Sequence, residues 1–305
     1  MGGHAFIRPG QRGTEEEQAE NARRISERLM TLVERDYNLV ITHGNGPQVG
    51  NLLLRNATPG VPETPLDVLV AQTEGSLGYY LQQAMLNELR RREVHRFVVT
   101  VVTQVLVDRA DPAFASPQKP VGPFMSKEEA LERAARLGWV VGEDAGRGYR
   151  RLVASPDPSQ VLQHRMVRQA AESGHIVIAA GGGGVPVAVG DDGDYEGVEA
   201  VIDKDLSSSL LANEVAADLL VILTAVDQVY LGWGTPEQRG LGAVTLAECE
   251  RMVASGAFPP GSMGPKVDAV LRFLQRGGKR ALITSPELLA SALDGAAGTH
   301  FIGRI

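Results

Sequence analysis

Cysteine is nearly absent from this sequence, since Cys249 is the only one among 305 residues. One cysteine excludes an intramolecular disulfide and a thiolate metal site, and this usage is typical of a reducing compartment. Long apolar runs are also missing: none reaches the roughly 20 residues that span a bilayer, and the first residues lack the apolar core of a signal peptide. We therefore expect a cytoplasmic protein without a membrane partner.

Basic residues are outnumbered by acidic ones, 30 against 37, which gives a net charge of -7. Such a balance disfavours nucleic acid or an anionic membrane surface as the main partner. Any anion that the protein binds must therefore be held by a local cluster of basic side chains. The hydrophobic content of 43% is enough for an ordinary globular core.

Short β-rich apolar runs alternate with helical stretches along most of the chain. This pattern predicts an α/β protein with a mainly parallel central sheet and helices on both faces, a three-layer αβα sandwich. The predicted strands are Asn38–Thr42, Phe97–Val107, His175–Ala180, Leu219–Thr224 and Arg280–Thr284. The predicted helices are a first one that ends near Asp36, then Leu66–Arg92, Ser159–Ser173, Leu206–Val215, Pro265–Gln275 and Pro286–Leu293.

Three helix starts are marked by a Ser or Thr with Glu three positions later, which is typical of a capping box. The pairs are Thr14 with Glu17, Ser126 with Glu129, and Thr245 with Glu248. Residues 111–158 interrupt the alternation, because they are rich in Pro, Gly and charge. We interpret them as a lid-like lobe inserted in a single domain of residues 1–305; the alternative is a long surface excursion without function.

Three glycine-bearing turns come directly after apolar runs or at the start of the chain: Gly2–His4, His43–Gln48 and Gly181–Pro186. The carboxyl ends of parallel strands open on one edge of a sheet, so such turns can meet around one ligand. Glycine lets backbone N–H groups approach phosphate oxygens closely. Any one of these turns, taken singly, is as readily explained by a structural role as by ligand binding. Neither a Rossmann fingerprint nor a P-loop motif is present.

Three lysines lie in rigid or glycine-rich stretches rather than on a solvated helix face. Lys119 lies between prolines in the predicted lobe, Lys204 lies in Val-Ile-Asp-Lys-Asp, and Lys266 follows Gly-Ser-Met-Gly-Pro. Phosphoryl transfer requires positive charge on the transferring oxygens, with donor and acceptor held in line. Asp205 can orient two such ammonium groups while it stays ionised; alternatively, or in addition, it caps a helix.

Other candidate residues point less directly to chemistry. His43 and His175 have no partner at metal-ligand spacing, so we expect structural roles for both. The serines at 207–209 lack the G-x-S-x-G elbow of a serine hydrolase. Tyr230 and Trp233 follow a predicted strand, where they either contact an adenine or pack in the core.

The chain resembles the carbamate kinases of the amino acid kinase superfamily over essentially its full length. Six stretches in the same order carry the resemblance: Thr42–Gly50, Lys119–Phe124, Glu143–Gly148, Gly181–Pro186, Glu199–Asp205 and Gly261–Lys266. The resemblance implies the amino acid kinase fold and reversible phosphoryl transfer between ATP and carbamate. In this family the usual direction is formation of ATP from carbamoyl phosphate and ADP.

The same resemblance implies roles for individual residues. Lys204 and Lys266 contact the transferring phosphates, Asp205 organises them, and Lys119 reaches over the site from the lobe. Phosphate and carbamate binding is expected at Gly2, Gly3, His4, Gly44, Asn45, Gly46, Gly182 and Gly183, and nucleotide binding at Thr224, Asp227, Tyr230, Met263 and Lys266. The resemblance further implies ATP or ADP with Mg²⁺, which the nucleotide mainly holds, and a homodimer.

The start of the chain departs from the family's pattern. The family has an apolar strand that leads into Leu-Gly-Gly-Asn, whereas this chain begins with Met1 and then Gly-Gly-His, so His4 stands in place of asparagine. A sheet without that strand exposes unpaired backbone groups and an apolar groove. We therefore expect the chain as given to be a shortened form that lacks about eight residues, one strand length.

Two other functions remain open from the sequence. A kinase of the same fold could act on another small carboxylate, phosphate or phosphonate acceptor, with His4 serving that acceptor. A metabolite-binding homologue could have lost turnover, in line with the absent first strand. Lys119 and its lobe favour the carbamate kinases over the first alternative, and the three lysines with Asp205 argue against the second.

Overall fold

A computed structural model gives the fold of residues 1–2, 5–8, 10–56, 62–144, 146, 148–259 and 263–304. The helices are α1 (Glu15–Glu34), α2 (Gly46–Asn56), α3 (Leu66–Arg91), α4 (Pro112–Ala115), α5 (Lys127–Leu137), α6 (His164–Glu172), α7 (Lys204–Glu214), α8 (Leu246–Ala254), α9 (Met263–Gln275) and α10 (Leu289–Leu293), with short 3-10 turns at Gly181–Gly183 and Pro286–Leu288. The strands are β1 (Val40–Ile41), β2 (Val98–Thr100), β3 (Gln104–Val107), β4 (Lys119–Met125), β5 (Val140–Glu143), β6 (Tyr149–Val153), β7 (Pro158–Val161), β8 (Ile176–Ile178), β9 (Val185–Val189), β10 (Tyr195–Gly197), β11 (Leu219–Leu223), β12 (Tyr230–Leu231), β13 (Arg239–Gly240), β14 (Ala243–Thr245), β15 (Arg280–Thr284) and β16 (Thr299–Ile302).

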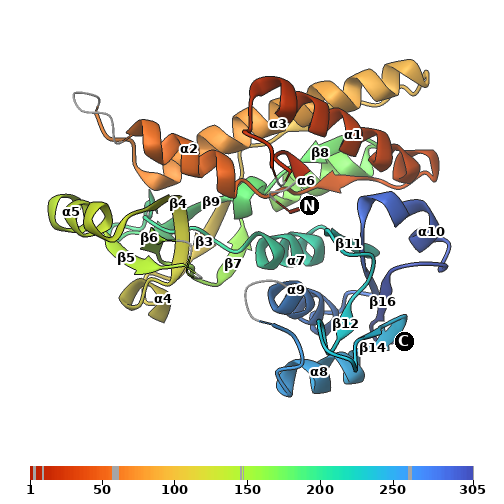
Figure 1. Ribbon diagram of the computed structural model, residues 1–305. Coiled ribbons are helices and arrows are strands. Elements are labelled where there is room, and N and C mark those ends of the chain that lie inside the picture. The colour runs from red at the N-terminus through yellow and green to blue at the C-terminus, as the bar shows by residue number, and fades with distance from the viewer. Residues whose placement is uncertain are drawn as a thin grey trace.

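The sheets at the centre of the molecule are largely parallel. One has the strand order β1-β8-β2 with parallel pairs throughout, and another has the order β11-β15-β16-β14, in which β15 and β16 run antiparallel. Helix α3 packs on β2 and β8, and α6 packs on β8 as well, while α7 and α9 pack on each other (Figure 1). This mixed α/β arrangement confirms the predicted fold class.

Apolar spacing explains why α1 and α3 lie side by side. Ile25 and Leu29 of α1, and Leu77 and Leu81 of α3, are buried in one cluster with Ile178 of β8. Residues four apart share one face of a helix, so each helix presents a continuous apolar stripe to the sheet. Thr14 and Thr245 close complete capping boxes with their glutamates, whereas at Ser126 the structure shows the serine half of the bond.

The predicted single strand at Phe97–Val107 is wrong, because the chain forms β2 and β3 in two different sheets. The break lies at Thr103, whose N–H donates to a carboxylate oxygen of Glu74 at 2.7 Å and whose hydroxyl donates to the Val101 carbonyl. The buried Glu74 carboxylate therefore accepts the Thr103 N–H, which a continuous strand would donate to the neighbouring strand. The chain bends there and pairs with β9 instead of continuing along β8.

The predicted helix Ser159–Ser173 is also partly wrong, since its first residues form β7 and the helix α6 begins at His164. Strand β7 pairs antiparallel with β3, and the Val161 N–H donates to the carboxylate of Glu214. Local composition cannot reveal these partners, because both lie about fifty residues away along the chain. The last predicted helix is split into the turn at 286–288 and α10.

Residues 119–153 form a small sheet of their own with the order β4-β6-β5, in which both pairs are antiparallel. Helix α5 connects β4 to β5 and packs on β5 and β6. Figure 1 shows this part protruding beside α2, and β4 packs on α2. We keep the name inserted lobe for residues 111–158.

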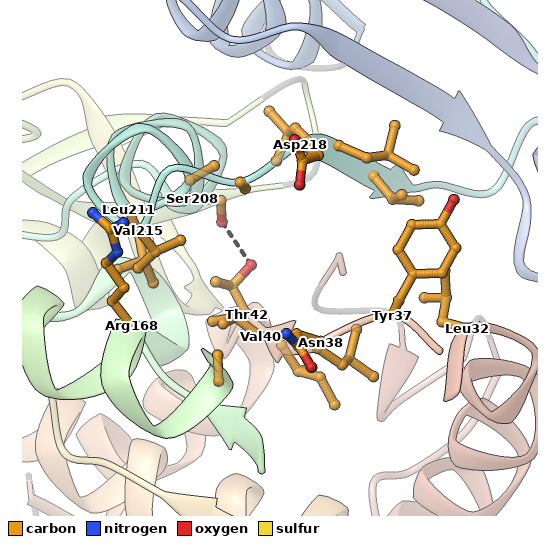
Figure 2. A pocket seen from close by; sticks show the side chains of 18 of the residues that line it. Leu32, Tyr37, Asn38, Val40, Thr42, Arg168, Ser208, Leu211, Val215 and Asp218 are labelled. Atoms are coloured by element: carbon orange, nitrogen blue, oxygen red, sulfur yellow. Dashed lines mark hydrogen bonds between the residues drawn. The ribbon is translucent and has the colours of Figure 1, made fainter. Parts of the chain in front are cut away.

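A groove separates the two parallel sheets at β1 and β11. Within the described residues, β1 pairs on one side with β8 and β11 pairs on one side with β15, so the facing edges carry no ladder. The cavity between them has a volume of about 420 Å³ and is lined mainly by apolar side chains of both strands, α1 and α7 (Figure 2). Thr42 and Ser208 bridge it through their hydroxyl groups at 2.6 Å.

Met1 pairs with the chain beyond β1 at this groove. Its amine donates to the Thr42 carbonyl at 2.9 Å, and the Gly44 N–H donates to the Met1 carbonyl at 3.0 Å. These two bonds flank His43 in the pattern of a parallel ladder. Any residue joined directly before Met1 would therefore point along the unpaired edge of β1.

We expect an apolar, β-prone segment of about eight residues fused directly before Met1 to form a further strand in this groove. It would satisfy the free edges of β1 and β11 and bury apolar surface, so the fusion should raise Tm. Thermal unfolding of the fused and unfused proteins measures the effect. A Gly/Ser segment of equal length is the control, and equal Tm for the apolar and Gly/Ser fusions would contradict the expectation.

Candidate active site

The carboxylate of Asp205 lies between two of the three predicted lysines. Its Oδ1 is 2.7 Å from the Lys204 ammonium, and its Oδ2 is 3.2 Å from the Lys266 ammonium. The Asp205 side chain is almost fully buried, and the two lysine side chains are only 20% and 17% exposed. Residues 62 positions apart are thus brought together by one acidic side chain, as the sequence analysis expected.

Asp205 stays ionised at every physiological pH. Burial acts to raise its pKa, but the adjacent Lys204 and Lys266 ammonium groups outweigh it and lower the pKa to about 2. An ionised carboxylate fixes the directions of the two ammonium groups. The site is therefore prepared for an anion with several oxygens.

Helix starts add to the positive potential at this site. Lys204 is the first residue of α7, and Lys266 lies in the first turn of α9. The first N–H groups of a helix have no partner within the helix and favour an anion, and α7 and α9 pack on each other. Helix α2 begins at Gly46, directly after the His43–Asn45 turn.

Asp203 was not identified from the sequence as a site residue. Asp203, and not Asp205, is the N-cap of α7, where its Oδ1 accepts the Asp205 N–H. Its other oxygen accepts a hydrogen bond from the Lys119 ammonium at 2.8 Å. The inserted lobe thus brings its lysine to the start of α7, one residue from Lys204. An Asp directly before a helix start was the available signal.

Two of the glycine turns meet, as predicted. Gly182 has a φ of 69° and donates its N–H to the His43 carbonyl at 2.7 Å, and a Cβ on it would collide with the Asn45 amide. Gly183 has a φ of 107°, and its carbonyl accepts the Ser207 hydroxyl of α7. Only glycine fits these positions without strain. The turns therefore lie against each other and against the start of α7.

The remaining predicted phosphate residues are placed as follows. Gly44 is buried and bonded to Met1, Gly46 is exposed at the start of α2, and the Gly2 carbonyl accepts the Ala5 N–H. Gly3 and His4 lie outside the described residues. Their predicted contacts with phosphate remain predictions.

The predicted nucleotide residues lie just beyond β11, in β12 and at the start of α9. Thr224 donates its N–H to the Thr284 carbonyl, and Asp227 accepts the Ser285 hydroxyl at 2.9 Å. Tyr230 of β12 packs on the ring of Trp233 at 5.3 Å, and Trp233 is 55% exposed. Met263 begins α9, the helix that carries Lys266.

Two buried titratable side chains lie behind the glycine turns. Burial lowers the pKa of His43 to about 4, so its imidazole is neutral at pH 7, and its ring packs edge-on against Phe6. Burial raises the pKa of Glu74 well above its usual range, although the N–H groups of Thr103 and Gly181 oppose that rise. Among the described residues, no cluster of three His, Cys, Asp or Glu could hold a metal ion.

A family model described as the amino acid kinase family matches residues 1–285. The chain therefore belongs to the amino acid kinase family. This finding agrees with the fold and with the lysine cluster at the helix starts. No helix in the part of the chain that the structure describes has the length and apolar character needed to cross a membrane.

Within this family, the chain is similar to carbamate kinases. It is 49% identical over 307 residues to the carbamate kinase of Thermococcus kodakarensis, and the alignment covers 99% of this chain and 97% of that protein. It is 47% identical over 308 residues to the carbamate kinase-like protein YahI of Escherichia coli, with 99% and 97% covered. A solved carbamate kinase from Giardia lamblia bound to AMP-PNP superposes with a TM-score of 0.93 at 38% identity, covering 99% of this chain and 96% of that one.

We expect Glu74→Gln to stabilise the protein increasingly as the pH rises. A carboxyl whose pKa is raised by folding contributes stability below the pKa of unfolded glutamate, and this contribution is lost as the pH rises through the folded value. Glutamine is neutral throughout and can still accept the Thr103 N–H. Thermal unfolding between about pH 5 and 9 should show a Tm difference between Glu74→Gln and wild type that widens with pH. A constant difference would contradict a raised pKa of Glu74 in the folded protein.

Proposed function

We propose that this protein is a carbamate kinase, which transfers a phosphoryl group reversibly between ATP and carbamate, and that it works mainly toward ATP synthesis. The observation that carries the proposal is the Lys204–Asp205–Lys266 cluster at the starts of α7 and α9. The similarity to carbamate kinases over nearly the whole chain supports the choice of acceptor.

The proposed reaction requires charge stabilisation rather than a covalent intermediate. In the synthetic direction, a β-phosphate oxygen of ADP attacks the phosphorus of carbamoyl phosphate, and the bond from phosphorus to the carbamate oxygen breaks. The electron pair of that bond leaves with carbamate, so no proton has to move. Lys204 and Lys266 neutralise the negative charge on the transferring oxygens, and Asp205 keeps both ammonium groups in place.

We assign the two substrates to different sides of this cluster. Lys119 reaches the site from the inserted lobe through Asp203, so we place it on the carbamoyl side. Thr224 and Asp227 lie just beyond β11, beside the end of β15, and Met263 begins α9, which suits a nucleotide beside Lys266. Tyr230, in β12, is assigned to the same side. The turn of 43–46 leads into the start of α2 at Gly46, where the first N–H groups of a helix favour phosphoryl oxygens, and the turn of 181–183 lies against it.

Mg²⁺ enters this proposal as part of the nucleotide substrate. Three ammonium groups surround the site, and its two carboxylates, Asp203 and Asp205, are each already paired with lysine. This donor set suits phosphate oxygens better than a resident cation. A Mg²⁺ ion bound with the nucleotide would add positive charge to that of the lysines.

We further propose a cytoplasmic homodimer. The exposed apolar residues Val68, Tyr79 and Leu86 are spaced 11 and 7 residues apart on α3, which places them on one helix face. A helix face with several exposed apolar side chains suits an interaction surface. The single cysteine, buried Cys249, suits a reducing compartment. Light scattering of the purified protein tests the dimer.

We expect ATP to form when the protein is mixed with ADP, Mg²⁺ and carbamoyl phosphate. Replacing either Lys204 or Lys266 by alanine should lower kcat by roughly 10²-fold or more, which is the scale for a lost electrostatic donor. Lys279→Ala removes a lysine from an exposed pair with Asp218 and serves as the control. Coupled detection of ATP at saturating substrates measures kcat. Unchanged kcat in either site variant would remove that lysine from the mechanism, and absence of ATP with nucleotide still bound would favour another acceptor or an inactive homologue.

A further inference from the structure

Residues 199–203, which we call the connecting segment, run from β10 to the start of α7 and contact the inserted lobe on the way. Glu199 accepts a hydrogen bond from Arg151 of β6 at 2.7 Å, and the Val201 N–H donates to the Ala154 carbonyl at 3.0 Å. Alternate residues of an extended segment point the same way, so positions 199, 201 and 203 can contact one neighbour. The connecting segment therefore runs alongside the end of β6 and the residue that follows it.

The connecting segment is also fixed to the main body. The second carboxylate oxygen of Glu199 accepts the N–H of Leu66, the first residue of α3, at 2.9 Å. Glu199 therefore bonds the lobe with one oxygen and the body with the other. The last residue of the segment, Asp203, is held by its hydrogen bond to the Asp205 N–H.

Asp203 uses its two oxygens for different purposes. The cap bond to the Asp205 N–H occupies Oδ1 and sets the orientation of the carboxylate, which leaves Oδ2 for the Lys119 ammonium. Burial acts to raise the pKa of Asp203, but Lys119 outweighs it and lowers the pKa below its usual value. The start of α7 therefore carries a fixed negative charge that faces the lobe.

The Asp203 carboxylate is charged and pairs with the Lys119 ammonium. Lys119 and Lys204 are both cations, and both interact electrostatically with Asp203, which is adjacent to Lys204 in the chain. A carboxylate between two like charges offsets their repulsion. A lysine has a long flexible stem and three N–H donors, and the bond to Asp203 takes one of them.

We infer that Asp203 is a positioning residue, which holds the Lys119 ammonium at the start of α7 so that its other donors face the acceptor substrate. Asp203 acts through Lys119 and does not itself contact the reacting atoms. The chemical consequence rests on the proposed function, whereas the contact between the lobe and Asp203 does not.

Asp203→Asn tests this inference with little disturbance of the helix. Asparagine caps a helix as well as aspartate does, so α7 keeps its first hydrogen bond while the charge facing Lys119 is lost. We expect kcat for ATP formation to fall about tenfold or more, with the affinity for ADP nearly unchanged. Asp218→Asn, in the exposed pair with Lys279, is the matched control and should leave kcat and Tm unchanged.

A double-mutant cycle with Lys119→Ala separates positioning from an independent role. If Asp203 acts through Lys119, adding Asp203→Asn to Lys119→Ala should change kcat less than about twofold. Independent losses in the two single variants that multiply in the double variant would overturn the inference. So would an unchanged kcat in Asp203→Asn alone.

Fluorescence of Trp139 reports on the lobe without any turnover. Arg151, which pairs with Glu199, lies 4.9 Å from the centre of the Trp139 ring, and Trp233→Phe leaves Trp139 as the only tryptophan. In that background, Asp203→Asn should increase quenching of Trp139 by acrylamide, because the lobe is held less firmly. Identical quenching would overturn the inference. If wild-type protein makes no ATP but quenching still responds, the proposed function fails and the contact between lobe and Asp203 stands.

Discussion

The bond between one buried carboxylate and two ammonium groups constrains most of this structure. Two like unit charges about 4 Å apart repel by roughly 4 kcal/mol at the effective dielectric of about 20 near a protein surface. Asp205 offsets that repulsion between Lys204 and Lys266 and stays ionised because both lysines lower its pKa. The packing of α7 on α9 brings both helix starts to one place, where this carboxylate lies between the two ammonium groups.

Pairing of lysine ammonium groups with carboxylates continues outward from Asp205. Asp203 provides a second fixed negative charge, which receives the lysine of the inserted lobe, so negative and positive side chains alternate from the lobe to α9. Behind this row, Gly182 and Gly183 let the backbone of the turn approach Asn45 and α7. The result is a row of donors backed by a rigid turn, which suits a phosphoryl group in transit between two anionic substrates.

Local patterns in the sequence predicted the elements whose partners are near in the chain or whose burial is complete. Strand β15 has the predicted bounds and α3 differs by one residue. Lys204 and Lys266 do lie together around Asp205, but that prediction came from the chemistry of phosphoryl transfer and from the family resemblance. The predictions that failed depend on distant partners. The strand at 97–107 breaks because Glu74 binds the Thr103 N–H, and the bond between Lys119 and Asp203 joins residues 84 apart. Composition and periodicity carry no information about such contacts.

Replacement of Asp205 by asparagine tests most directly whether this carboxylate organises the site. The amide has the same shape but no charge, so the account predicts that kcat at saturating ADP, Mg²⁺ and carbamoyl phosphate falls by roughly 10²-fold or more while the fold is retained. ADP should bind at least as tightly, because the site becomes more positive. A kcat within about threefold of wild type, measured on folded protein, would contradict the central role of Asp205.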